Sequence, residues 1–221
     1  MQDEMVFAPI GRITTGIQPN TLVMRTIDFL CQRLPEWRDD DRPLDESENR
    51  LTAQLPKFLN RHAESFQFYT QEPQRGSFSV DLSVTPYDDY YKCFFYIECK
   101  RLPTPSPKGR EREYVTGGEG KRSGGIQRFK LGLHGPEHNI AAIIGYVQNE
   151  SCEFWYETIN SWIDDLIAGI ALDGSVWCDG ENLTQYTEDT RGIARCESLH
   201  PRNNSDDIRI IHLWINMRHK S

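Results

Sequence analysis

The first part of the chain repeats its apolar residues at helical spacing. Residues 21–34 carry such a stripe and are followed by Pro35, so the pattern predicts a helix that ends at the proline. A charged connector at 36–43 separates it from a second predicted helix over residues 45–64. The apolar stripes consist of Leu22, Ile27, Leu30 and Leu34 in the first helix and of Leu51, Leu55, Phe58 and Leu59 in the second.

Strand-like runs follow, rich in β-branched and aromatic residues and separated by short stretches of Pro, Gly and Asp. They predict three strands joined as hairpins, at residues 65–69, 77–85 and 92–100. A glycine-rich loop comes next, and residues 124–134 then predict a short helix that ends before a Gly-Pro pair. Residues 140–147 are apolar on both alternating faces, which is typical of a strand covered by helices on both sides.

The last third of the chain predicts a long amphipathic helix over residues 153–170 and a final strand over residues 208–217, separated by a polar stretch without a usable period. The central order of helix, three strands, helix and strand predicts a mixed α/β fold, in which a meander is extended by one crossover. We expect one domain, composed of an N-terminal helical extension (1–43), a core (44–148) and a C-terminal helix and strand packed on the core (149–221).

Composition narrows the class of protein. The 221 residues are 38% apolar and 11% aromatic, as in an ordinary globular domain. The six cysteines and six histidines show no zinc-ligand or other metal-binding spacing, so we expect them to be packing or surface residues. The N-terminus lacks the pattern of a signal peptide, and the longest apolar run, 140–147, is too short to cross a bilayer. We therefore expect no membrane association and a cytoplasmic location.

Charge is distributed unevenly along the chain. The formal net charge is −8, yet residues 100–130 hold nine basic and three acidic residues, so this stretch carries +6 and the remaining chain −14. A basic segment of this kind either forms a solvated loop or neutralises the phosphates of a nucleic acid. The candidate nucleic-acid-binding residues are Arg101, Lys108, Arg110, Arg112, Lys121, Arg122, Arg128 and Lys130.

The strand predicted at 92–100 ends in charged residues. Glu98 and Lys100 share one face of an extended strand, because side chains two positions apart point the same way. Asp81 lies in the preceding strand, opposite the apolar face expected for Phe78, Val80, Leu82 and Val84, and can reach the same pocket. Two carboxylates suit Mg²⁺, and a neighbouring lysine can orient or activate water. The alternative is an ordinary ion pair at an exposed end of the sheet.

Two further polar residues are candidates for the same site. In the second predicted helix Glu48 lies on the buried stripe, whereas Glu46 lies on the other side, so Glu48 is the stronger candidate for a third acid. The alternative for either residue is a first-turn acid that interacts with the helix dipole. In the helix predicted at 124–134, Gln127 either faces the pocket, where it holds a phosphate or water, or is polar surface.

These residues resemble the PD-(D/E)xK nuclease superfamily, which has the restriction-endonuclease-like fold. That family has an αβββαβ core, with Asp on the second strand and the triplet (D/E)xK on the third. Asp81 and the triplet Glu98-Cys99-Lys100 match these positions. The proline that often precedes the aspartate is absent, since Val80 stands there.

The resemblance covers residues 44–148 and implies a mixed central sheet flanked by helices, with N- and C-terminal additions. Many members add a Glu on the first core helix, matched by Glu48, and a Gln on the second, matched by Gln127. The implied activity is Mg²⁺-dependent hydrolysis of DNA phosphodiesters, with Mn²⁺ as a substitute, in restriction, repair or anti-phage defence. The implied metal ligands are Asp81, Glu98 and Glu48; Lys100 positions or activates water, and Gln127 assists.

Alternative functions stay open at this point. The same fold can serve as a catalytically inactive module that binds nucleic acid or a protein, and Tyr87, Tyr90 and Tyr91 suit such a surface. An unrelated α/β protein with a coincidental Glu-x-Lys triplet is a third hypothesis. Within the nuclease hypothesis, RNA instead of DNA, cleavage from ends or inside the polymer, and action as a homodimer or with a protein partner are all open.

Overall fold

The computed structural model describes residues 19–40, 47–74, 78–89, 92–104, 110–117, 121–203 and 206–218. None of the helices in these ranges combines the length and the apolar character needed to cross a membrane. The elements are α1 (Pro19–Asp39), α2 (Glu48–Leu59), β1 (Phe66–Pro73), β2 (Ser79–Pro86), β3 (Phe95–Leu102), α3 (Gly125–Lys130), β4 (Ile140–Val147), α4 (Cys152–Ile167), β5 (Thr184–Glu188), β6 (Ile193–His200) and β7 (Ile208–Asn216).

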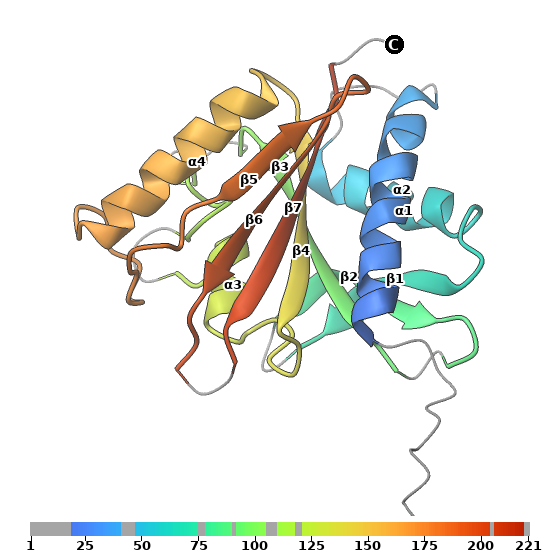
Figure 1. Cartoon of the computed structure of the whole chain (residues 1–221), viewed down its shortest axis with the longest axis horizontal. Coiled ribbons are helices and arrows are strands. Elements are labelled where there is room, and N and C mark those ends of the chain that lie inside the picture. The colour runs from blue at the N-terminus through green and yellow to red at the C-terminus, as the bar shows by residue number, and fades with distance from the viewer. Residues whose placement is uncertain are drawn as a thin grey trace, which may run out of the picture.

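The strands form one mixed sheet in the order β1-β2-β3-β4-β7-β6-β5 (Figure 1). β1, β2 and β3 form an antiparallel meander, β3, β4 and β7 are parallel, and β6 and β5 continue antiparallel. Parallel neighbours need a crossover connection, and the chain supplies one through α3 between β3 and β4. The predicted mixed α/β fold, with helices flanking a mixed sheet, is confirmed.

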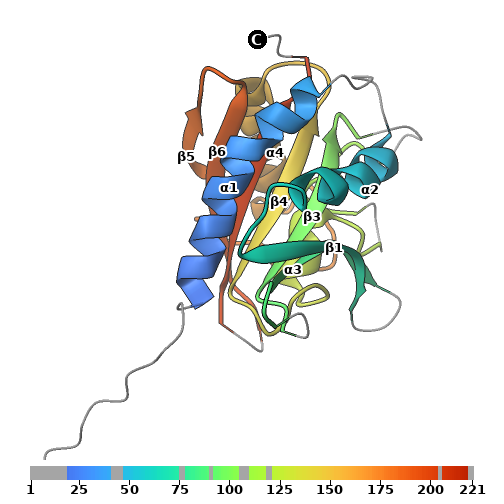
Figure 2. The same ribbon diagram turned by 90° about the vertical axis from the view of Figure 1, so that its right-hand side faces the viewer.

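Helices cover both faces of this sheet (Figure 2). Leu30 of α1 and Leu55 of α2 are fully buried in one core, together with Ile97 of β3. Ile126 of α3 and Ile159 of α4 belong to a second core on the opposite face. Burying one such aliphatic side chain stabilises the fold by about 1.5–3 kcal/mol, so both faces of the central strands contribute to stability.

Helix α1 does not end at Pro35, and that part of the prediction is wrong. The helix continues to Asp39 with the proline inside it, although proline removes one backbone hydrogen bond from a helix. Tertiary contacts hold the last turn: Trp37 is fully buried, and the Arg38 guanidinium donates to the backbone carbonyls of Arg191 and Asn216. Packing therefore outweighs the local helix-breaking signal.

Strands β5 and β6 were not predicted, because they lie in the polar stretch between the last predicted helix and strand. β6 buries polar side chains that pair with other polar groups, and such positions produce no apolar alternation. Glu197, for example, is buried and accepts hydrogen bonds from Arg195 and Arg209. A hydrophobic period detects strands only where the buried face is apolar.

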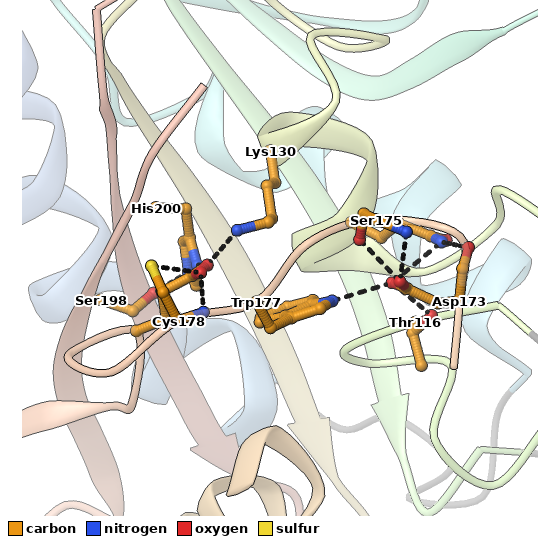
Figure 3. A network of polar contacts seen from close by, with 10 residues as sticks. Thr116, Lys130, Asp173, Ser175, Trp177, Cys178, Ser198 and His200 are labelled. Atoms are coloured by element: carbon orange, nitrogen blue, oxygen red, sulfur yellow. Dashed lines mark hydrogen bonds and ion pairs between the residues drawn. The ribbon is translucent and has the colours of Figure 1, made fainter. Parts of the chain in front are cut away.

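A second group of buried polar residues in β6 and β7 forms a continuous hydrogen-bonded series, which we call the polar chain. Ser198 Oγ lies 2.7 Å from His200 Nε2 and 2.8 Å from His212 Nε2. His200 Nδ1 lies 2.7 Å from an oxygen of Glu181, a part of the network that Figure 3 shows from close by. In order, the members of the polar chain are Trp214, Tyr114, His212, Ser198, His200 and Glu181.

The hydrogens of the polar chain can be assigned, because each link determines the next. Burial alone would raise the pKa of Glu181, but His200 and Lys130 hold it at about 2, so the carboxylate accepts from His200 Nδ1. Neutral His200 then accepts the Ser198 hydroxyl through Nε2, and Ser198 Oγ accepts from His212 Nε2. His212 Nδ1 accepts from the tyrosine hydroxyl, which accepts from the indole. Every donor therefore points toward Glu181, and both histidines are neutral.

This arrangement predicts that acid destabilises the fold. Burial lowers the folded-state pKa of His200 and of His212, whereas unfolded histidine takes up a proton near its ordinary value of 6.5. Below pH 6.5 the unfolded chain therefore binds more protons, and each histidine removes up to about 1.4 kcal/mol of stability per pH unit. Urea unfolding between pH 7.5 and 5 should show a shallower loss for His212→Gln than for the wild type.

The exposed His62 provides the control, because His62→Gln removes a histidine that does not belong to the polar chain. Other titrating groups are the same in all three proteins and cancel in the comparison of slopes. Equal slopes for the wild type and His212→Gln would contradict the assignment of a neutral His212.

Candidate functional site

Glu98 and Lys100 lie on the α3 side of β3, as the alternation of the strand predicts. Phe95, Ile97 and Cys99 belong to the core beneath α1 and α2, so the intervening positions face the other way. Both charged side chains are buried, with side-chain exposures of 1% for Glu98 and 8% for Lys100. Lys100 Nζ lies 2.8 Å from Glu98 Oε1, which makes a buried ion pair.

One residue of α3 and one that follows this helix also contact Glu98. Arg128 Nη1 donates to Glu98 Oε1 at 2.9 Å, and His134 Nδ1 lies 3.3 Å from Glu98 Oε2 without the alignment of a hydrogen bond. Burial would raise the pKa of Glu98, but the charges of Lys100 and Arg128 and the contact with His134 hold it below its ordinary value. Glu98 is therefore an ionised carboxylate at neutral pH.

The β2–β3 ladder ends beside these residues and leaves a fork between the two strands. Its last pair toward the site is Leu82–Ile97, so β2 residues before Leu82 have no ladder partner in β3. The β1–β2 ladder skips the position of Gln71 and Asp81, and Gln71 has a φ of 55°. The fork and this kink turn Asp81 toward β3.

The same kink overturns the expected apolar face of 78–84. Val80 packs in the core beneath α3 and α4, whereas Leu82 and Val84 pack beneath α1 and α2. Strict alternation would have kept all three side chains on one face. The prediction of a single face is wrong because it assumed a regular strand.

Two carboxylates occupy the backbone edge of β3 that the fork leaves open. Asp81 Oδ2 accepts from Cys99 N at 2.8 Å, and Glu48 Oε2 accepts from Arg101 N at 2.8 Å. The other oxygen of Glu48, Oε1, lies 3.7 Å from Lys100 Nζ. Each carboxylate thus binds the backbone of β3 through one oxygen, and its second oxygen does not take part in that hydrogen bond. Glu48 begins α2, and the alternative Glu46 lies outside the described residues.

The acids and the lysine influence one another electrostatically. Burial and the charges of Glu98 and Glu48 raise the pKa of Asp81 to about 7, although Lys100 and the Cys99 amide oppose the rise. Burial would lower the pKa of Lys100, but Glu98, Glu48 and Asp81 raise it above its ordinary value. The structure therefore brings Glu48, Asp81, Glu98 and Lys100 together as one group, which we call the carboxylate site.

Gln127 makes its contacts away from the carboxylate site. Its Oε1 accepts from Gly117 N and Gly124 N, and its Nε2 donates to the backbone oxygen and to Oδ2 of Asp173. The Asp173 carboxylate also accepts from Thr116 and from Trp177, as Figure 3 shows. The glutamine thus holds the loop before α3 in place, and the structure does not bring it to Glu98 or Lys100.

Most of the described basic residues between 100 and 130 form ion pairs within the protein. Arg110 pairs with Glu113, Arg112 with Asp165, and Arg128 with Glu98. Lys130 is buried, pairs with Glu181 and lies 4.7 Å from the centre of the Trp177 ring, so it is not available to a nucleic acid. Arg101 is half-buried and donates to Pro103 O, Lys121 and Arg122 are exposed, and Lys108 lies outside the described residues.

His134 is the residue of this site that the sequence did not indicate. It is fully buried against Glu98, with the rings of Phe78 and Phe129 edge-on to it. The expectation that the histidines are packing residues agrees with the contacts of His134 to the two phenylalanines. It does not account for the contact of His134 with the Glu98 carboxylate. In the sequence His134 stands directly before a Gly-Pro pair, and such a pair indicates a turn. This local pattern does not indicate a functional site.

The donor chemistry of the carboxylate site fits Mg²⁺. No three His, Cys, Asp or Glu side chains in the described ranges are already arranged as a metal-binding group. All the acids nevertheless offer the oxygen ligands that Mg²⁺ prefers. Buried Glu98 Oε2 has no aligned donor, and burial, together with the charges of Glu98 and Glu48, raises the pKa of Asp81. A divalent cation would offset the negative charge of these acids, and Asp81, Glu98 and Glu48 are the residues that would hold it.

Comparisons with protein-family models, with curated proteins and with solved structures found no match to this chain.

Proposed function

We propose that this protein is a Mg²⁺-dependent nuclease that hydrolyses DNA phosphodiesters, with Mn²⁺ as a substitute. The observation that carries the proposal is the carboxylate site, in which Asp81 and Glu48 anchor to the open edge of β3 beside the Glu98–Lys100 pair. Burying each of these charges costs several kcal/mol. Acids from one helix and two strands that gather around one buried lysine therefore favour a functional role for the group. A role in restriction, repair or anti-phage defence is part of this proposal.

The order of elements supports a restriction-endonuclease-like core. From α2 through β1, β2, β3 and α3 to β4 the chain follows the αβββαβ order, with Asp81 on the second of these strands and Glu98 and Lys100 on the third. The meander and the parallel β3–β4 pair agree with this arrangement. Helix α1 and the elements after β4 are additions to it.

In the proposed mechanism each residue has a separate task. Asp81, Glu98 and Glu48 hold the cation, which supplies Lewis-acid stabilisation of charge on the phosphate when it is bound. Lys100 Nζ, fixed by Glu98, orients the attacking water and offsets negative charge beside the phosphate. Exposed Lys121 and Arg122, which precede α3, are available to contact the nucleic-acid backbone.

A second candidate is a catalytically inactive module that binds nucleic acid. It is favoured by the almost complete burial of Glu98, whose charge Lys100 and Arg128 already neutralise. In that case the carboxylate site is a structural ion cluster, and the exposed Tyr87 is a candidate stacking residue, whereas Tyr90 and Tyr91 lie outside the described residues.

The decisive experiment incubates the purified chain with single- and double-stranded DNA, linear and circular, and with RNA. Each substrate is tested with Mg²⁺, Mn²⁺, Ca²⁺ or EDTA. We expect cleavage of DNA with Mg²⁺ and Mn²⁺ and none with EDTA. The circular substrates separate cleavage inside the polymer from cleavage at ends, and RNA tests the choice of substrate.

Glu98→Gln preserves the size of the side chain and serves as the inactive control. Binding of DNA without cleavage under any metal would favour the second candidate. Cleavage that persists in Glu98→Gln would mean that a contaminant or another site is responsible, and the proposal would fail.

A further inference from the structure

Arg128 differs from the other cations around Glu98 in how loosely it is held. Its guanidinium makes one hydrogen bond in the described part of the chain, from Nη1 to Glu98 Oε1, and lies 5.9 Å from the centre of the Phe78 ring. Its Nε is buried without an acceptor. A bidentate pair would use two of the five donors that arginine offers, so this contact is weaker than the geometry of the two groups allows.

Glu98 does not need Arg128 for its neutralisation. The same oxygen, Oε1, already lies 2.8 Å from Lys100 Nζ, and Lys100 is more deeply buried than Arg128, whose side chain is 22% exposed. Arg128 thus reaches the carboxylate from the solvent side, and its guanidinium can leave without exposing an unpaired Glu98. Phe78 offers a flat ring over which it can lie on the way.

The guanidinium of Arg128 occupies part of the Glu98 carboxylate that a divalent cation would bind. Glu98 Oε2 has no hydrogen bond and is open to a cation, but Arg128 and Lys100 hold Oε1 of the same carboxylate, so a divalent cation on Oε2 would be repelled by both of them. Lys100 cannot withdraw easily, because it also faces Glu48 and is enclosed beside Gly125. Arg128 is therefore the replaceable positive charge.

We propose, resting on the nuclease function above, that Arg128 stands in for the divalent cation beside Glu98 and moves to the substrate phosphate when the cation binds. In the metal-free protein it keeps the buried carboxylate paired. After displacement its planar donors are free for two phosphate oxygens, a geometry that lysine cannot reproduce. The same residue thus limits metal binding in the absence of DNA and favours it when DNA is present.

The experiment measures Mn²⁺ affinity by electron paramagnetic resonance, without DNA, for the wild type, Arg128→Gln and Arg128→Lys. Removal of a competing cation should tighten Mn²⁺ binding about tenfold in Arg128→Gln. Cleavage of DNA at saturating Mn²⁺ should fall about 100-fold in the same variant, because a phosphate contact is lost. Arg128→Lys should keep Mn²⁺ affinity near that of the wild type and restore little of the cleavage.

Arg209→Gln is the control, since Arg209 is an exposed arginine of β7 paired with the buried Glu197 of β6, and it should leave both quantities unchanged. Thermal melting verifies that all variants fold. Tighter Mn²⁺ binding together with slower cleavage supports the proposal, because a purely structural arginine would not improve metal binding. Unchanged or weaker Mn²⁺ binding in Arg128→Gln would overturn it.

The proposal and the function on which it rests fail in different ways. If Mn²⁺ binds the wild type and Glu98→Gln abolishes that binding, the metal site stands whatever Arg128→Gln shows. If Mn²⁺ binds none of these proteins, or binds Glu98→Gln as well as the wild type, the nuclease function is wrong and this role of Arg128 falls with it.

Discussion

Replacing Lys100 with methionine should lower the rate of DNA hydrolysis by at least about a thousand-fold. Methionine retains the length and apolar body of the side chain but removes the ammonium group. Glu98 keeps Arg128 as a partner, so the carboxylate is not left unpaired and the fold should survive. The measurement is single-turnover cleavage at saturating Mg²⁺, at a temperature where circular dichroism shows the wild type and the variant to be fully folded.

Lys130 provides a matched control for this substitution. It is another buried lysine paired with a glutamate, Glu181, but it lies in the network of Figure 3, away from the carboxylate site. Lys130→Met should be destabilised and yet cleave DNA at nearly the wild-type rate once folded. Similar losses of activity in both variants would show that removing any buried lysine lowers activity. Lys100 would then have no specific role in the proposed chemistry.

Replacing Glu181 with alanine should destabilise the fold by about 3–5 kcal/mol, the largest stability effect that we expect from a single substitution. Glu181 is fully buried, and one carboxylate receives Lys130 Nζ, His200 Nδ1 and the backbone N–H of Cys178. Alanine would leave the buried Lys130 ammonium and the buried His200 N–H without an acceptor, and the Cys178 N–H would lose its partner. Urea unfolding followed by tryptophan fluorescence measures the loss directly.

Two controls separate this effect from general sensitivity to mutation. Glu157→Ala removes an exposed glutamate of α4 and should change stability by no more than about 0.5 kcal/mol. Adding Lys130→Met to Glu181→Ala removes the unpaired cation and should recover part of the loss. A loss below about 1 kcal/mol in Glu181→Ala would contradict the inferred network.

The sequence predicted the parts of the structure that follow regular apolar periods. The helices and strands from α1 to β4 appear in the expected order, and Glu98 and Lys100 share a face because β3 is a regular strand. The buried stripe of α2 favoured Glu48 over Glu46; Glu48 Oε1 lies 3.7 Å from Lys100 Nζ, and since Glu46 lies outside the described residues the choice between them stays a prediction. These results depend on local periodicity, which a single sequence contains.

Features set by tertiary contacts escaped the prediction. Pro35 lies inside α1 because distant carbonyls hold the last turn, and β6 is invisible to an apolar period because it buries Ser198, His200 and Glu197. Gln127 has the expected helical position, but the Asp173 carboxylate, 46 residues later, binds its amide. Partners so distant in sequence cannot be identified from spacing alone.

The fork between β2 and β3 changes what joins the two strands near the carboxylate site. Beyond Leu82–Ile97 the two strands are joined by the Asp81 carboxylate on the Cys99 amide and by no ladder pair. Other contacts hold the β1–β2 hairpin at this end, since Gln74 Oε1 accepts from Gly135 N and Val80 is fully buried beneath α3 and α4. Widening the fork would therefore expose core side chains, whereas the parallel ladders on the other side of β3 would be left unbroken.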